Sequence, residues 1–233
     1  MRADQLLVDR GLAASRSQAQ RLIAAGVRWR LPGNGWKAVT KNGEELRETV
    51  ELELLDTAES RYVSRGGLKL EAALSHCGID VTGLRCLDVG QSSGGFTDCL
   101  LQRGAARVVG VDVGQGQLHP RLRADPRVVC IEKCNARELT ERQLLEAGGE
   151  AAAAPFDLIV GDLSFISQTL VWPAIVPLLK PSGHLLMLVK PQFELQPEHI
   201  GKGGLVKETT SYALVQQRVA QACQNNGLQR RDY

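Results

Sequence analysis

The sequence predicts an α/β protein in two parts: a small α+β domain followed by a doubly wound, mostly parallel sheet. Strand-like apolar runs alternate with helix-like segments from residue 66 onward, which is the pattern of repeated βαβ units. A glycine-rich turn over 90–95 joins one such strand to a helix, as in βαβ units that bind nucleotides. Two neighbouring stretches of opposite charge set residues 1–58 apart as a domain of their own.

The composition is that of an ordinary soluble globular protein. The 233 residues are 43% hydrophobic and 23% charged, with a formal net charge of +2. No apolar run approaches the ~18 residues that a membrane span requires, and charged residues stand at the N-terminus where a signal peptide would be apolar. The six cysteines lie mostly within apolar patterns. We therefore expect a cytoplasmic protein with reduced cysteines, no membrane association and no metal site.

The first 58 residues have the features of a small nucleic-acid-binding domain. Residues 1–41 contain eight lysines and arginines against two acids, whereas residues 44–59 contain seven acids against one arginine. A local basic face followed by an acidic edge favours a nucleic-acid partner over a uniformly solvated surface. The residue patterns predict helices over 3–10 and 15–25, a strand over 27–31, a turn over 32–35 and a strand over 50–54.

A linker and a helix follow this domain. Residues 59–65 are predicted to link the two domains, because the stretch around them contains few apolar groups. The second domain is expected to span residues 66–233 and to open with a helix over 66–77. Lys69 lies beside the apolar face of this helix rather than within it.

The stretch from Cys86 to Asp112 is the centre of the second domain. Its glycines let the backbone approach a ligand closely, and the following helix directs free N–H groups toward that ligand. Asp112 ends the next strand, where a carboxylate can accept both hydroxyls of a ribose. The stretch therefore predicts a nucleoside-containing ligand. Its elements are a strand over 86–89, the turn over 90–95, a helix over 96–103 and a strand over 106–111.

The turn lacks the features of two common nucleotide sites. A P-loop needs a Gly-Lys-Ser or Gly-Lys-Thr ending, and the run Gly-Gln-Ser-Ser-Gly-Gly does not match the dinucleotide fingerprint. A ribose with a carboxylate-bearing tail remains, and S-adenosylmethionine is its natural candidate. The alternative is a turn that only packs a helix on a strand.

The rest of the second domain continues the alternation of strands and helices. Pro173 and Pro177 should distort one of the helices, because proline cannot donate a backbone hydrogen bond. The predicted elements are strands over 128–131, 156–160 and 185–189, helices over 166–179 and 209–226, and the start of another strand over 227–233.

Polar residues follow several of these strands. Parallel strands end at the same edge of a sheet, where ligands of α/β proteins bind. Asp112, Asn135, Asp162 and Lys190 all stand at such strand ends.

Lys190 and Asp162 are the candidate catalytic pair. Lys190 follows an apolar strand, so its ammonium should be partly desolvated, and such a lysine can act as a base near neutrality. With Lys69, these residues would form a Lys-Asp-Lys set. An ordinary surface or ion-pair role is the alternative for each of them.

The N-terminal pattern RADQLLVDRGLAASRSQAQRLIAAGVRWR resembles the S-four-type RNA-binding module. In that module the second helix and the next strand present arginines to RNA. The resemblance implies phosphate contacts that position RNA without reading its sequence. A solvated basic face is the alternative. The implied RNA-binding residues are Arg2, Arg16, Arg21, Arg28, Arg30 and Arg65.

The stretches YVSRGGLKLEAAL, CLDVGQSSGGFTDCLLQRGA, DLSFIS and LVKPQFE resemble the TlyA family, haemolysin-A-like proteins that are ribosomal RNA 2′-O-methyltransferases. The second domain is similar to the Rossmann-like, FtsJ-like RNA ribose methyltransferases. The resemblance implies S-adenosylmethionine as cofactor, ribosomal RNA or ribosomal subunits as partners, and Lys69, Asp162 and Lys190 as catalytic residues. The implied cofactor-binding residues are Asp88, Gly90, Ser92, Gly94, Phe96, Asp112, Asn135 and Asp162.

Two departures from the family pattern are expected. The family's fourth catalytic residue is a glutamate on a strand after the final helix, and the sequence ends at Tyr233, so the C-terminal strands of the sheet are expected to be missing. Gln91 stands where relatives usually carry a smaller residue. The alternatives are an RNA-binding or ribosome-assembly protein with an inactive methyltransferase domain, and a haemolysin, for which the sequence offers no spanning or secretory segment.

Overall fold

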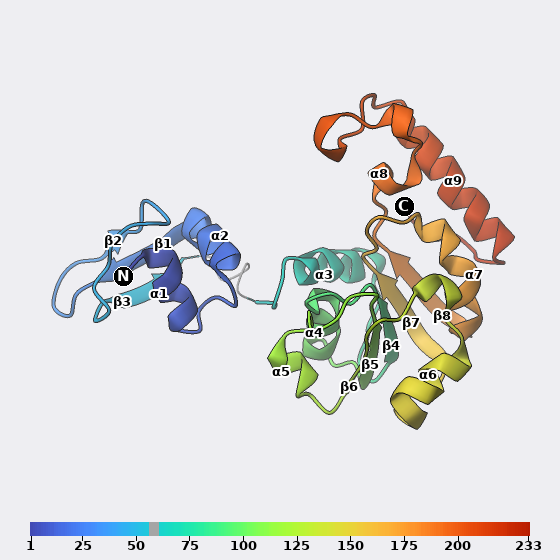
Figure 1. Cartoon of the computed structure of the whole chain (residues 1–233), viewed down its shortest axis with the longest axis horizontal. Helices are drawn as coiled ribbons and strands as arrows, with labels where there is room; N and C mark the ends of the chain where they lie inside the picture. The colour runs from blue at the N-terminus through green and yellow to red at the C-terminus, as the bar shows by residue number, and fades with distance from the viewer. Residues whose placement is uncertain (56–60) are drawn as a thin grey trace. The chain divides into compact units, whose positions relative to one another are not determined.

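The computed structural model describes residues 1–55 and 61–233 of the chain (Figure 1). These residues form two compact units, Met1–Lys69 and Leu70–Tyr233. Residues 59 and 60 of the predicted linker lie outside the described residues. Tyr62, which falls within the predicted linker, is only 3% exposed, and its carbonyl accepts a hydrogen bond from the Gln18 side chain.

The first unit is an α+β fold with a three-stranded antiparallel sheet in the order β2-β1-β3. The predicted helices and strands are confirmed, and Ser15 caps the second helix by accepting the N–H of Gln18. The two-residue strand β2 was not predicted, since two residues are too few to show an alternation. The elements are α1 (Ala3–Asp9), α2 (Arg16–Gly26), β1 (Val27–Arg30), β2 (Lys37–Ala38) and β3 (Glu51–Leu54).

The core of this unit lies between the helices and one face of the sheet. Leu6, Leu7 and Leu22 from the helices pack with Val27 of β1 in one buried cluster. Successive residues of a strand point to opposite faces, so the arginines of β1 are left on the other face of the sheet.

The second unit is a doubly wound α/β fold. Its five strands are all parallel and lie in the order β6-β5-β4-β7-β8. In Figure 1, α3 and α4 cover one face of the sheet, and α6, α7 and α9 cover the other. The strands are β4 (Arg85–Val89), β5 (Arg107–Val111), β6 (Val128–Ile131), β7 (Phe156–Gly161) and β8 (Leu179–Met187). The helices are α3 (Gly66–Cys77), which belongs to this unit from Leu70 onward, α4 (Gly95–Gln102), α5 (Pro120–Arg123), α6 (Glu141–Gly148), α7 (Trp172–Ile175), α8 (Pro191–Glu194) and α9 (Ser211–Asn225).

Three of the predicted elements were wrong in detail. The helix predicted over 166–179 is broken into α7 and two 3-10 turns, because Pro173 and Pro177 each occupy the first turn of a short helix, where a missing N–H costs least. Strand β8 starts at Leu179, six residues earlier than predicted, and ends at Met187. The residues over 227–233 form no strand.

The register of the sheet brings the predicted polar residues to one edge. Val89 at the end of β4 pairs with Val111 of β5 on one side and with Gly161 of β7 on the other. Asp112 and Asp162 are the next residues along β5 and β7, so they leave the sheet at the same level as the glycine turn after β4.

Gln91 fits this sheet because β5 carries a glycine opposite it. The Gln91 side chain is 3% exposed and donates a hydrogen bond of 2.9 Å to the Thr97 hydroxyl. A Cβ atom at Gly110 would lie 2.0 Å from the Gln91 side-chain carbon Cδ. The larger residue at position 91 is thus accommodated by the absence of a side chain at position 110.

We expect Gly110→Ala to lower the free energy of unfolding by about 1–3 kcal/mol, because the added methyl group overpacks a buried site. Adding Gln91→Ala should recover most of that loss, since it removes the side chain that the methyl group strikes. Denaturant unfolding of the two single variants and the double variant measures this coupling. The prediction would be contradicted if the loss of unfolding free energy in the double variant equalled the sum of the losses in the two single variants.

Candidate active site

The turn between β4 and α4 lies close to the loop that follows β7. Gly90 and Gly94 have φ angles of 83° and 94°, which residues with a Cβ atom rarely adopt. A Cβ atom at Gly90 would lie 3.5 Å from the backbone oxygen of Asp162. Gly94 caps α4 without a side-chain hydrogen bond, and the Thr97 N–H donates to Asp88, so the N–H groups that precede Thr97 in that helix can donate to an anionic ligand.

Asp112 is fixed beside this turn. One carboxylate oxygen accepts the N–H of Ser92 at 2.7 Å, and the other accepts the N–H of Gly114 at 2.7 Å. Each carboxylate oxygen has a further lone pair, so Asp112 can still accept the hydroxyls of a ribose.

Asp88 is a buried carboxyl group near the end of β4. It is 1% exposed, and its oxygen Oδ2 accepts the Thr97 hydroxyl at 2.7 Å. Its other oxygen, Oδ1, has no hydrogen-bond partner among the described residues. Burial raises the pKa of Asp88 to about 7. A buried acceptor without a donor, beside a glycine turn, fits the ammonium group of an amino-acid tail such as that of S-adenosylmethionine.

Phe96 and Asn135, the two other predicted cofactor contacts, differ in their exposure to solvent. The Phe96 side chain is 6% exposed within α4. Asn135 is exposed, and its side-chain oxygen accepts the N–H of Arg137. Asn135 borders a cavity of about 460 Å³ at the end of β6, whose lining includes Glu132, Lys133 and Cys134.

Lys190 and Asp162 form an ion pair at the carboxyl edge of the sheet. The Lys190 Nζ atom lies 2.6 Å from the Asp162 Oδ1 atom, and the two side chains are 19% and 23% exposed. The same ammonium donates to the Ser164 hydroxyl at 2.7 Å. The sequence predicted this pair but not Ser164, which comes into reach through the conformation of the loop after β7.

Lys69 lies in the first turn of α3 and its side chain is exposed. It is the last residue of the first unit, whereas Asp162 and Lys190 belong to the second unit. Its participation with them in one catalytic set stays a prediction.

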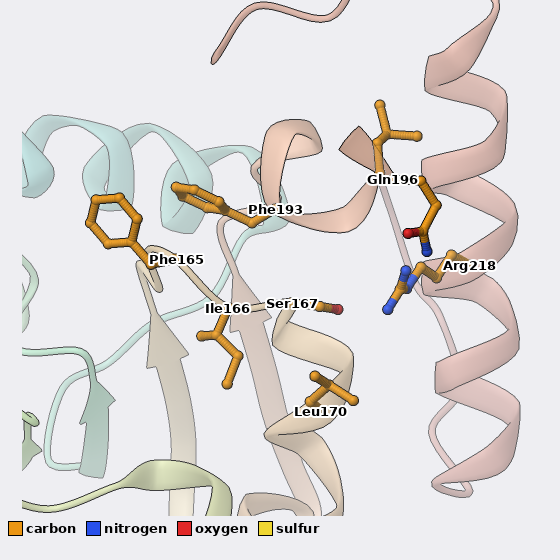
Figure 2. A pocket seen from close by; sticks show the side chains of 8 residues that line it. Phe165, Ile166, Ser167, Leu170, Phe193, Gln196 and Arg218 are labelled. Atoms are coloured by element: carbon orange, nitrogen blue, oxygen red, sulfur yellow. The ribbon is translucent and has the colours of Figure 1, made fainter. Parts of the chain in front are cut away.

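Two phenylalanines lie beside Lys190 and border a cavity of about 330 Å³ (Figure 2). The ring centroids of Phe165 and Phe193 are 5.3 Å apart, and the Lys190 Nζ atom lies 6.0 Å from the Phe193 ring centroid. Phe165 is 92% exposed and has a φ angle of 64°, so the loop holds an apolar ring in solvent. Figure 2 shows Gln196 and Arg218 on the opposite side of the cavity from these rings. Sequence reasoning did not identify this aromatic pair, because the two residues are distant in the chain.

The arginines of the first unit differ in how far their charge is balanced. Arg2 and Arg16 both contact the buried carboxylate of Asp4 at 3.0 Å, and their side chains remain 48% and 52% exposed. This cluster of two arginines and one carboxylate retains a net positive charge.

Each arginine of β1 forms an ion pair with one glutamate of β3, so its charge is balanced. Arg28 pairs with Glu53 at 2.5 Å and Arg30 pairs with Glu51 at 2.6 Å, both across the antiparallel register. The guanidinium groups of both arginines also lie over the ring of Trp36, at 5.0 and 4.6 Å from its centroid.

The two other predicted RNA contacts are on the surface of the first unit. Arg21 donates to the backbone oxygen of Ser17, and Arg65 is exposed.

Within 1–55 and 61–233, no group of three or more His, Cys, Asp and Glu side chains is arranged to hold a metal ion. Within the same residues, no helix has the length and apolarity needed to cross a membrane.

The five parallel strands with helices on both faces form the Rossmann-like fold of S-adenosylmethionine-dependent methyltransferases. The structure of Aeropyrum pernix fibrillarin with natively bound S-adenosylmethionine matches with a TM-score of 0.50 and 20% identity, over 70% of this chain and 66% of that chain, which is a similarity of fold.

The chain belongs to the FtsJ-like methyltransferase family, whose model matches residues 62–231, and within it to the TlyA family. It is 45% identical to the 16S/23S rRNA (cytidine-2′-O)-methyltransferase TlyA of Mycobacterium tuberculosis, over 97% of this chain and 80% of that protein. The solved structure of a hemolysin-named protein from Streptococcus thermophilus matches with a TM-score of 0.70 and 38% identity, over 97% of this chain and 78% of that chain. The resemblance to the TlyA family is therefore confirmed.

We expect Asp88→Asn to change the pH dependence of stability. The ordinary pKa of Asp88 is 3.8 and burial raises it to about 7, so between these values the folded chain holds a proton that the unfolded chain has lost. The free energy of unfolding of the wild type should therefore fall as the pH rises through this window, and less steeply in the variant. Denaturant unfolding at about pH 5 and about pH 8 measures the difference. Equal slopes of the free energy of unfolding against pH in the wild type and the variant would contradict a raised pKa at Asp88.

Proposed function

We propose that this protein transfers the methyl group of S-adenosylmethionine to a ribose 2′-hydroxyl of ribosomal RNA. The observation that carries the proposal is the Lys190–Asp162 ion pair, which stands beside the glycine turn at the carboxyl edge of the sheet. The printed name of the Mycobacterium tuberculosis relative, a 16S/23S rRNA (cytidine-2′-O)-methyltransferase, supports the same reaction and substrate.

The residues around the glycine turn would hold the cofactor. Asp88 offers a buried acceptor without a donor, Asp112 offers a fixed carboxylate, and Gly90 leaves room for close approach of a ligand. S-adenosylmethionine, when bound, supplies an electrophilic methyl group. What the chain must then provide is placement of the ribose and removal of its hydroxyl proton.

Lys190 is suited to that proton transfer. A ribose hydroxyl is a very weak acid, so a base must be positioned at it when its oxygen reacts. Lys190, in its neutral form, can accept this proton, and Asp162 then stabilises the ammonium that results. Ser164 limits the directions in which the amine can point, since it accepts a hydrogen bond from the same nitrogen. Lys69 would be the third member of this set.

The aromatic pair beside Lys190 gives a reason for an RNA substrate. An exposed ring of Phe165 next to Phe193 offers a surface on which an unstacked base can lie, as in sites that bind single-stranded RNA. A base held there would carry its ribose close to the Lys190–Asp162 ion pair. Loops and unpaired nucleotides of ribosomal RNA would then be preferred over helical segments.

The first unit would supply sequence-independent affinity for RNA, as its resemblance to the S-four-type module implies. Arg2 and Arg16 are the strongest candidates for phosphate contacts, because they share a single carboxylate and stay about half exposed. Arg28 and Arg30 are already balanced by Glu53 and Glu51, so contact with a phosphate would require partial loss of these ion pairs.

We expect Lys190→Ala to lower methyl transfer about 100-fold or more, because a positioned base contributes factors of that order. The matched control is Lys180→Ala, since Lys180 of β8 also forms a 2.6 Å ion pair, with Asp157 of β7. The control should retain activity. The measurement is transfer of labelled methyl from S-adenosylmethionine to ribosomal RNA in isolated subunits, with the modified nucleoside identified by mass spectrometry.

Three results of that assay would contradict the proposal. The first is transfer by Lys190→Ala at the wild-type rate. The second is a methyl group found on the base rather than on the ribose. The third is no transfer by the wild type with cofactor binding intact, which would favour an RNA-binding protein with an inactive methyltransferase domain.

We expect the double variant Arg2→Ala/Arg16→Ala to bind RNA more weakly, and the slope of log affinity against log salt to become shallower by about 1–2. Arg28→Ala should have a smaller effect, because Glu53 already balances its charge. Arg142→Ala, which removes an 83% exposed side chain on α6, is the control for loss of general positive charge. Fluorescence anisotropy of labelled RNA over a salt series measures all three. Equal losses in the three proteins would refute specific phosphate contacts by Arg2 and Arg16.

A further inference from the structure

One buried carboxylate, that of Glu194, joins the two loops that carry the Lys190–Asp162 ion pair. Glu194 is the last residue of α8, the single turn that directly follows Lys190, and it is 3% exposed. Its oxygen Oε1 accepts the backbone N–H of Gln168 at 2.9 Å, and its oxygen Oε2 accepts the Ser167 hydroxyl at 2.5 Å. Ser167 lies in the loop that begins with Asp162, and Gln168 is the first residue of the 3-10 turn that follows this loop.

A third segment, α9, is attached to the same residue. The Arg218 Nε atom lies 3.5 Å from the Glu194 Oε2 atom, and the Arg218 Nη1 atom donates to the Glu194 backbone oxygen at 2.9 Å. Glu194 therefore links the loop after β7, the loop after β8 and α9.

The chain between this link and the catalytic pair is short and constrained. On one side, α8 is closed by the N–H of Phe193 donating to the Lys190 oxygen at 2.9 Å. On the other side, the segment from Asp162 to Ser167 passes through Phe165 at a φ angle of 64°, a backbone conformation that the surroundings must maintain. A shift of either loop at Glu194 would change the separation of the Lys190 Nζ and Asp162 Oδ1 atoms.

The chemistry of the Glu194 side chain indicates what the link between the two loops does. Burying a charged group costs free energy, and an apolar contact could join two loops at lower cost. A carboxylate adds direction, because it accepts a backbone N–H and a hydroxyl at fixed positions. Such geometric constraint is needed where two side chains must be held within a few tenths of an ångström of each other.

We propose that Glu194 is a positioning residue for catalysis, which holds the loops of Asp162 and Lys190 in register. The proposal rests on the methyl transfer proposed above. Glu194 acts through these loops, since its carboxylate contacts Ser167, Gln168 and Arg218. It also fixes Ser167 and Arg218, which line the cavity bordered by Phe165 and Phe193.

The test compares Glu194→Ala, Glu194→Gln and a matched control in the methyl-transfer assay. We expect Glu194→Ala to lower kcat about 10–100-fold with the KM for S-adenosylmethionine changed less than about threefold, because misplacement of a catalytic group affects the reacting step rather than cofactor binding. Glu194→Gln should restore most of kcat, since an amide oxygen can still accept the N–H of Gln168.

Asp157→Ala is the matched control. Asp157 also accepts a backbone N–H, that of Arg85 at 2.9 Å, and also forms an ion pair, with Lys180. It stands near the start of β7, at the opposite end of the strand from Asp162. This variant should lose stability while its kcat per folded molecule remains close to that of the wild type.

A second measurement does not depend on activity. The ¹H–¹⁵N signal of the Lys190 ammonium, identified by its loss in Lys190→Ala, should move toward the signals of exposed lysines in Glu194→Ala and stay in place in Asp157→Ala. An unchanged signal and unchanged kcat in Glu194→Ala would overturn the proposal. The proposal would also be overturned if the loss of activity in Glu194→Ala and in Asp157→Ala equalled the fraction of each variant that is unfolded.

The two readouts separate failure of this inference from failure of the proposed function. A wild type without methyl transfer refutes the proposed reaction, whereas the ammonium signal still reports on the positions of the loops. If Glu194→Ala does not fold, Ser167→Ala replaces it, since it removes one of the two hydrogen bonds from the loop after β7. A kcat lowered about 3–10-fold would then support the proposal, and a wild-type kcat would overturn it.

Discussion

The candidate active site depends on the register of the parallel strands in the second unit. Val89, Val111 and Gly161 are aligned across three neighbouring strands, so the residues that follow them leave the sheet at one level. A slip of one residue would turn each following side chain to the opposite face of the sheet. Both faces of these strands are buried, so a slip would move each side chain into packing that is shaped for its neighbour in the chain. Packing of apolar residues therefore fixes the positions of polar ones.

Register places the candidate catalytic groups Lys190 and Asp162 near each other, but it does not determine the distance between their atoms. Lys190 and Asp162 approach to 2.6 Å because the loops that follow β7 and β8 are themselves fixed. Ser164 restrains the lysine directly, and Glu194 restrains both loops from the side of α9. The site thus combines a rigid sheet edge with two short loops held by a few directional hydrogen bonds. This arrangement leaves the ion pair only partly exposed, so its strength is less reduced by water than that of a surface pair.

In the first unit, charge balance matters more than the number of arginines. The sequence places a basic stretch before an acidic one, and the fold then pairs parts of the two across an antiparallel sheet. Arg28 lies opposite Glu53 in that register, so its charge is largely balanced within the protein. Arg2 and Arg16 instead share the single carboxylate of Asp4 and retain a net positive charge. The candidate RNA surface is therefore smaller than the sequence alone indicates.

The sequence by itself determined the fold class, the glycine turn and the residues at the strand ends, because these follow from local patterns of apolar, glycine and charged residues. It also predicted the Lys190–Asp162 pair, since parallel strands must end at one edge. Only the tertiary structure decided the partners of these residues. The hydrogen bonds of Ser164 and Glu194, and the pairing of Phe165 with Phe193, depend on loop conformations that no periodic pattern encodes. The physical reason is that hydrogen bonds and ring contacts between distant segments form only after the sheet and helices have placed those segments side by side.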